Sequence, residues 1–158
     1  MTVALMYTLE AKIPPPAILL LLGGLAAAAA AYLPAFTFDM PYSQLFAGVL
    51  ALVGLSLNIY PKLSFNQAGT TVNPLKLASA VHLVTSGVYR YTRNPMYLGH
   101  SVILLGWSLY LQNMIALLVV PLFIVFVSRF QIQPEERHLS ALFPDEYAAF
   151  CKRVPRWL

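Results

Sequence analysis

Three long runs without a single charged side chain most strongly constrain what this chain can fold into. They cover residues 13–38, 40–61 and 94–128. A transmembrane helix needs about 20 predominantly apolar residues, because the hydrocarbon core of a bilayer is roughly 30 Å thick. Each run is long enough for at least one such helix. We therefore expect an integral membrane protein rather than a water-soluble enzyme.

The third run is too long for a single crossing. One helix over residues 94–128 would extend about 50 Å at roughly 1.5 Å per residue. The polar pair Gln112 and Asn113 lies in its middle, so we predict two helices that form a tight hairpin. The expected fold class is all-α, a polytopic membrane protein with four transmembrane helices. They are predicted near residues 15–35, 42–60, 95–111 and 114–130.

The composition agrees with this interpretation. Hydrophobic residues make up 59% of the chain and charged residues only 10%, whereas about 25% of an average soluble domain is charged. Intrinsic disorder is excluded, because it requires low hydrophobicity and high net charge. The single cysteine, Cys151, excludes a disulfide framework within the chain. The length predicts one domain over residues 1–158.

All ten basic residues fall on one side of the predicted bilayer. They lie in the N-terminal tail, in the connection between the second and third helices, and after the fourth helix. The positive-inside rule then places both termini and the long connection in the cytoplasm, most simply at a bacterial inner membrane. This distribution accounts for the net charge of +4, so we expect no nucleic-acid partner. The ten residues are Lys12, Lys62, Lys76, Arg90, Arg93, Arg129, Arg137, Lys152, Arg153 and Arg156.

Two smaller patterns refine the predicted helices. Small residues in the second helix, Ala47, Gly48, Ala51 and Gly54, form a face suited to close helix packing. After the fourth helix, apolar residues recur at helical spacing, and Pro144 marks a helix start. We therefore expect cytoplasmic amphipathic helices over residues 134–158.

A first polar and aromatic cluster lies at the start of the third predicted helix. Asn94 and Pro95 are predicted as the N-cap and the first helical residue, so free backbone N–H groups and the positive helix end face this region. Such an end can receive an anionic group. Alternatively, Tyr89, Tyr91 and Tyr97 form an interfacial aromatic belt, and the neighbouring arginines contact lipid headgroups.

A second cluster, Glu135 and Glu136, follows Pro134 near the end of the fourth predicted helix. The two carboxylates either stabilise the positive end of the next helix or take part in a functional site. The three histidines do not have the spacing of a helical zinc motif. We therefore expect no metal. The histidines are His82, His100 and His138.

Three separated blocks resemble the isoprenylcysteine carboxyl methyltransferase family and its phospholipid methyltransferase relatives. The blocks occur in the family's order, and the resemblance covers roughly residues 62–158. They are NQAGTTVNP (residues 66–74), LVTSGVYRYTRNPMYLG (residues 83–99) and EERHLSALFPDEYAAFCKRVPRWL (residues 135–158).

The resemblance implies an enzyme that uses S-adenosylmethionine on the cytoplasmic face of the membrane. It implies a methyl acceptor that is lipophilic and enters from the bilayer. Glu136 lies adjacent to the implied cofactor contacts. Carried over residue by residue, those contacts are His82, Leu83, Val84, Tyr89, Asn94, Pro95, Met96, Tyr97 and Glu135.

The chain departs from the family pattern at two positions. Asn94 stands where many members have a histidine, so a proton-transfer role at this position is lost. Gln131 stands where the prenylcysteine enzymes have an arginine that serves the substrate, and Arg129 lies two residues earlier. We expect Arg129 to hold and orient the acceptor in place of that arginine.

Several acceptors remain open. An isoprenylcysteine-like carboxylate is the favoured acceptor and needs no general base. A phospholipid amine would have to lose a proton first, and Glu136 is then the candidate base. A thiol or a phenolic lipid is also open. The alternatives outside this activity are a non-enzymatic four-helix membrane protein, such as a transporter subunit or assembly factor, and a family member that binds the cofactor without turnover.

Overall fold

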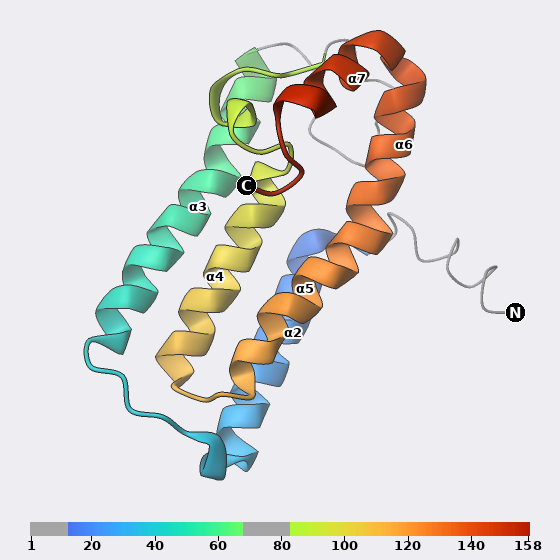
Figure 1. The fold of residues 1–158 in the computed structure, drawn as a ribbon. Helices are drawn as coiled ribbons and strands as arrows, with labels where there is room; N and C mark the ends of the chain where they lie inside the picture. The colour runs from blue at the N-terminus through green and yellow to red at the C-terminus, as the bar shows by residue number, and fades with distance from the viewer. Residues whose placement is uncertain (1–12, 68–82) are drawn as a thin grey trace, which may run out of the picture.

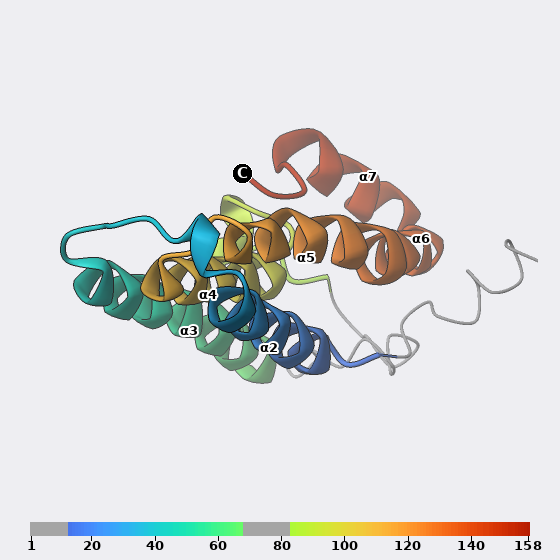
Figure 2. The same ribbon diagram turned by 90° about the horizontal axis from the view of Figure 1, so that it is seen from below.

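The computed structural model describes residues 13–67 and 83–158. Within these ranges the chain is helical, with short connections and one isolated β-bridge between Thr37 and Asn113. The main helices of the bundle lie side by side, with α4 in contact with each of the other three (Figures 1 and 2). They are α2 (Pro15–Tyr32), α3 (Ser43–Gln67), α4 (Pro95–Leu111) and α5 (Val119–Val127). The all-helical fold class is thus confirmed.

Three helical segments are long and apolar enough to cross a membrane. They cover Pro15–Tyr32, Ser43–Leu63 and Ala116–Leu142. Their outer surfaces carry exposed apolar side chains, among them Leu20 and Val125. Helix α4 has 17 residues and is shorter than these segments.

The predicted boundary between residues 114–130 and 134–158 is wrong. Helix α5 continues through a π-helical turn, Ser128–Ile132, into α6 (Gln133–Leu142) without a loop. A proline in an α-helix clashes with the carbonyl four residues before it. The wider π turn lies where Pro134 would meet the carbonyl of Phe130, so the helix continues past the proline.

The predicted end of the second helix, near residue 60, is also wrong. Helix α3 continues through Pro61 to Gln67. Pro61 is fully buried. Prolines are tolerated inside membrane helices where neighbouring helices and local backbone adjustment compensate for the missing hydrogen bond.

Helices α3 and α4 approach each other through glycines. A Cβ atom added to Gly54 would lie 2.6 Å from the carbonyl oxygen of Gly99, closer than a side chain can be. Ala47 packs against Gly106 in the same interface. Gly48 has open space around it, so the predicted small-residue face is confirmed at Gly54 and Ala47 but not at Gly48.

The connections α2–α3 and α4–α5 lie together at one end of the bundle (Figure 1). The Phe38 amide donates to the Gln112 carbonyl at 2.9 Å, and the Met114 amide donates to the Phe36 carbonyl at 2.9 Å. Gln112 adopts the left-handed conformation, with a φ of 51°, and ends α4 where the sequence predicted an interruption.

At the other end of the bundle the chain folds back on itself. Helix α7 (Pro144–Arg153) begins at the predicted proline and returns toward the start of α4 (Figure 1). It packs against the 3-10 turn η3 (Gly87–Arg90). The apolar cluster between these two elements contains Tyr89, Tyr147, Phe150 and Val154.

Candidate functional site

The two clusters predicted from the sequence meet at the end of the bundle where α4 begins. The Tyr97 hydroxyl, in the first turn of α4, donates to Glu135 Oε1 in α6 at 2.5 Å. Tyr97 is buried, whereas Glu135 retains some exposure. No donor to the second oxygen of Glu135 is present in residues 13–67 or 83–158. That oxygen is therefore the part of the pair that a ligand could engage.

The neighbouring Glu136 is held by two arginines instead. Arg93 Nη1 lies 2.9 Å from Glu136 Oε1. Arg156 donates to both carboxylate oxygens, from Nε at 3.0 Å and from Nη2 at 2.6 Å. Such two-point contacts fix geometry as well as charge. Glu136 thus joins the segment before α4, helix α6 and the C-terminal segment.

Arg93 also reaches helix α7. Its Nη1 lies 3.1 Å from the Tyr147 hydroxyl and 2.9 Å from Cys151 Sγ. Burial raises the pKa of Tyr147, so its phenol stays neutral beside the ion pairs. The hydrogen bonds from Arg156 to Glu136 raise the pKa of that guanidinium further.

Asn94 precedes α4 as predicted, but its side chain does not cap the helix. Its side-chain amide donates to the Arg156 carbonyl at 2.9 Å, and the Arg93 amide donates to the Pro155 carbonyl at 3.1 Å. The C-terminal segment therefore lies against the start of α4. This placement leaves the first turn of α4, with Pro95 buried and Met96 partly buried, beside Glu135.

The η3 side of the site contributes apolar and aromatic groups. Leu83 and Val84 pack on the cluster that contains Tyr89. Burial, followed by the negative charge of Glu135, raises the pKa of Tyr89. Leu83 and Val84 thus pack with Tyr89, and Tyr97 pairs with Glu135.

Three positions singled out in the sequence are not among the contacts described above. His82 lies outside the described residues. Arg129 lies in the π turn, with its guanidinium carbon 5.7 Å from the centre of the Phe130 ring. Gln131 is fully buried, and its side-chain amide donates to the Ile13 carbonyl at 2.9 Å.

Sequence reasoning missed the two arginines that hold Glu136 and the two groups that contact Arg93. Arg93, Tyr147, Cys151 and Arg156 were visible only as members of the family blocks, because no local spacing places them together. Their contacts with the site span 20 to 58 residues of sequence. The arrangement as a whole offers a carboxylate oxygen, phenols and a helix N-terminus. It can bind a small ligand that carries both a cationic and an anionic group.

Comparison with known proteins shows that the sequence is similar to methyltransferases. The family model for phospholipid methyltransferases matches residues 42–146. An uncharacterized protein of Haemophilus influenzae is 46% identical over 63 residues, which are 40% of this chain and all of that protein. Protein-S-isoprenylcysteine O-methyltransferase of Schizosaccharomyces pombe is 36% identical over 73 residues, 46% of this chain and 31% of the yeast protein.

The mouse protein of the same name is 38% identical over 76 residues, 48% of this chain and 27% of the mouse protein. The chain therefore matches about a third or less of the length of these named relatives. No solved structure matches it significantly.

Proposed function

Because this chain belongs to the phospholipid methyltransferase family, we propose that it is an integral membrane methyltransferase that uses S-adenosylmethionine. The observation that carries this proposal is the pairing of Tyr97 with Glu135 at the start of α4. The two residues are 38 positions apart and belong to two separate blocks of the family resemblance. The apolar helices support the membrane location.

The residues present fit this cofactor. S-adenosylmethionine supplies an electrophilic methyl group on a sulfonium and carries an ammonium and a carboxylate. Glu135 would hold the ammonium or a ribose hydroxyl through its second oxygen. The backbone amides in the first turn of α4 suit the carboxylate. Tyr89 and Tyr97 offer aromatic faces that attract a cation, and Leu83, Val84, Asn94, Pro95 and Met96 would complete the pocket.

The proposed acceptor is a lipophilic carboxylate that enters from the bilayer. The named relatives are isoprenylcysteine O-methyltransferases, which supports an oxygen acceptor. Arg129, in the π turn before Glu135, would orient the carboxylate. Gln131 is already bonded to the Ile13 carbonyl, so its amide is not free for this task.

Methyl transfer to a carboxylate requires only that the protein bind and orient the two reactants. The attacking oxygen is anionic and needs no base, so the residues have only to align it and exclude water. The negative charge of the carboxylate and the positive charge of the sulfonium cancel in the transition state, and a pocket that excludes water favours this loss of charge. A phospholipid amine, the alternative acceptor, needs a base. Both oxygens of Glu136 are already engaged by arginines, which weighs against that role.

We further propose that four helices cross the membrane, with α4 and α5 as a tight hairpin. The connections α2–α3 and α4–α5 contain no basic residue and lie together, whereas the candidate site lies at the opposite, basic end. The positive-inside rule supports a cytoplasmic location of the site and of both termini. We propose a bacterial inner membrane as its location.

The direct test is transfer of a radiolabelled methyl group from S-adenosylmethionine by the purified protein in lipid vesicles. N-acetyl-S-farnesylcysteine and phosphatidylethanolamine serve as the two acceptor probes. The proposal predicts that the label enters N-acetyl-S-farnesylcysteine as a methyl ester. Mild base hydrolyses such an ester and releases the label as methanol, whereas an N-methyl group is stable to mild base. Base-stable label in phosphatidylethanolamine would instead assign the amine alternative. No transfer to either probe would contradict the proposed carboxylate acceptor.

A further inference from the structure

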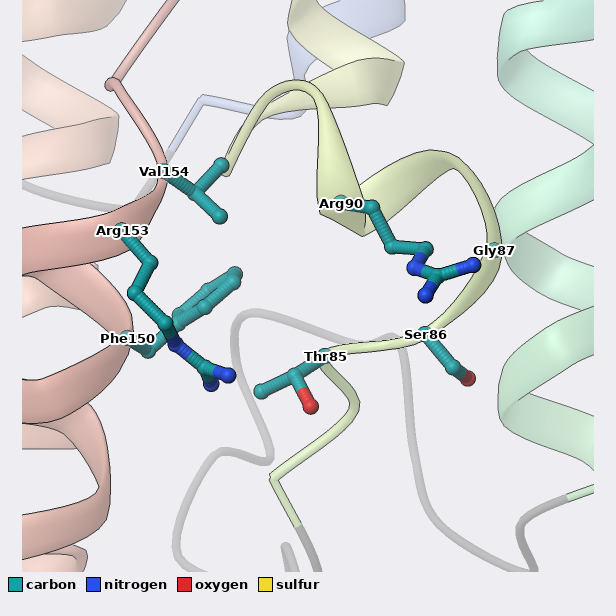
Figure 3. A pocket seen from close by; sticks show the side chains of 7 residues that line it. All are labelled: Thr85, Ser86, Gly87, Arg90, Phe150, Arg153 and Val154. Atoms are coloured by element: carbon teal, nitrogen blue, oxygen red, sulfur yellow. The ribbon is translucent and has the colours of Figure 1, made fainter.

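A cavity of about 440 Å³ lies between η3 and α7, beside the candidate site (Figure 3). Arg90 and Gly87 border it on the η3 side, and Arg153 and Phe150 on the α7 side (Figure 3). Its volume is in the range of small-molecule sites, roughly 300–1,000 Å³. The lining residues are Thr85, Ser86, Gly87, Arg90, Phe150, Arg153 and Val154. None of them is among the proposed cofactor contacts.

The charge of the cavity has one sign. Arg90 and Arg153 line it, and no acidic residue is among its lining residues in the described part of the chain. Within residues 13–67 and 83–158 neither guanidinium is paired with a carboxylate. Arg93 and Arg156, by contrast, are both held by Glu136. The two lining arginines therefore retain their full capacity to bind an anion.

The fold fixes these two arginines on either side of the cavity. Tyr89 is buried against α7, so the next residue, Arg90, is on the exposed side of the η3 turn. Gly87 has a φ of 63°, a backbone conformation that suits glycine and lets the chain turn into η3. Arg153 ends α7, three residues after Phe150, which is buried in the same cluster as Tyr89.

We propose that this cavity binds the phosphate group of a phosphate ester. An arginine presents paired N–H donors that match the oxygens of a phosphate, and two arginines with the Thr85 and Ser86 hydroxyls offer more donors than one carboxylate can accept. The cavity also has room for the ester substituent, against which the Phe150 ring can lie. The ligand class covers an anionic phospholipid headgroup and a soluble phosphate ester.

The test uses calorimetric titration of the full chain purified in detergent. The probes are dihexanoyl phosphatidylglycerol, glycerol 3-phosphate, and dihexanoylglycerol as the phosphate-free control. The proposal predicts saturable binding of at least one phosphate-bearing probe and none of dihexanoylglycerol. Binding of the phospholipid alone assigns a lipid headgroup, and equal binding of glycerol 3-phosphate assigns a soluble ester. Absence of binding by both phosphate probes overturns the proposal.

Matched variants locate the binding. Arg90→Gln and Arg153→Gln are each expected to lower the affinity for the phosphate-bearing probe at least tenfold. Lys152→Gln removes a neighbouring charge outside the cavity and is expected to leave this affinity unchanged. Equal affinity in all three variants would overturn the proposal. Unchanged thermal unfolding without ligand checks the fold. If a Gln variant unfolds, the Lys variant at the same position keeps the charge but loses the paired donors, and is expected to bind more weakly than the wild type.

This inference does not depend on methyl transfer. Titration of S-adenosylmethionine into Arg90→Gln and Arg153→Gln is expected to give the wild-type affinity, because neither arginine is among the proposed cofactor contacts. Loss of cofactor binding in these variants would mean that the cavity belongs to the cofactor site and would overturn a separate phosphate site. Intact phosphate binding in a protein that never binds the cofactor would contradict the proposed function alone.

Discussion

At the scale of single residues, Glu135 and Glu136 are adjacent in sequence but have different surroundings. Glu135 pairs with a buried tyrosine, and Glu136 with two arginines. The sequence singled out both carboxylates as one cluster. It could not divide their roles, because their partners lie 20 to 43 residues away and only the folded chain brings them together.

Tyr97→Phe removes the hydroxyl that holds Glu135 and nothing else. We expect the affinity for S-adenosylmethionine to fall about tenfold, since a hydrogen bond to a charged group contributes roughly 1.5–3 kcal/mol. Tyr110→Phe, in the same helix but half exposed, is the matched control and should bind normally. Calorimetric titration measures both. An unchanged affinity in Tyr97→Phe would show that this pair does not shape the cofactor pocket.

Glu136→Gln leaves Arg93 and Arg156 without their carboxylate. Removing one partner of a fully buried ion pair costs roughly 3–5 kcal/mol. The Arg156 side chain is 38% exposed, so we expect a smaller loss of about 2 kcal/mol in the free energy of unfolding. Glu146→Gln, an exposed acid in α7, is the control. Thermal unfolding in detergent gives the comparison, and equal midpoints for the two variants would argue against this structural role.

At the scale of elements, the apolar runs predicted where most helices begin, and Pro144 and Gln112 marked boundaries correctly. Two helices continue past their predicted ends and past Pro61 and Pro134, because a proline ends a helix only where nothing compensates for the lost hydrogen bond. The π turn before Pro134 provides such compensation, and Pro61 is fully buried within α3. Neither has a local sequence signature.

Gly54→Leu tests the closest helix contact. Its side chain would meet the α4 backbone at Gly99, so helices α3 and α4 would have to separate. We expect a loss of about 3 kcal/mol in unfolding free energy, at the upper end for overpacking. Gly48→Leu makes the same change in open space on the same helix and should be tolerated. Chemical unfolding in detergent measures both, and equal stability would contradict the observed packing.

At the scale of the whole molecule, the charge asymmetry of the sequence and the bundle agree. The two connections without basic residues hydrogen-bond to each other, and the basic residues of the site lie at the opposite end. The sequence could predict this division because charge patterning is read along the chain. It could not predict which side chains face one another across the site, because that depends on packing between distant segments.

The orientation can be measured by cysteine labelling in a Cys151→Ser background. We expect a membrane-impermeant maleimide to label Asp39→Cys in right-side-out vesicles and Lys152→Cys in inside-out vesicles. The native side chains of Asp39 and Lys152 are both exposed on the protein surface, so the fold itself should not hinder the maleimide at either position. Labelling of both positions from the same side would contradict the proposed topology.

Glu135 and the start of α4 are proposed to form a pocket for S-adenosylmethionine. Calorimetric titration of that cofactor into the detergent-purified protein tests this most directly. We expect saturable binding with a Kd of about 100 µM or tighter, equivalent to roughly −5.5 kcal/mol. We also expect that binding is lost in Glu135→Gln and kept in Glu146→Gln. Failure of the folded wild-type protein to bind, with or without added lipid, or an unchanged affinity in Glu135→Gln, would contradict the proposed pocket.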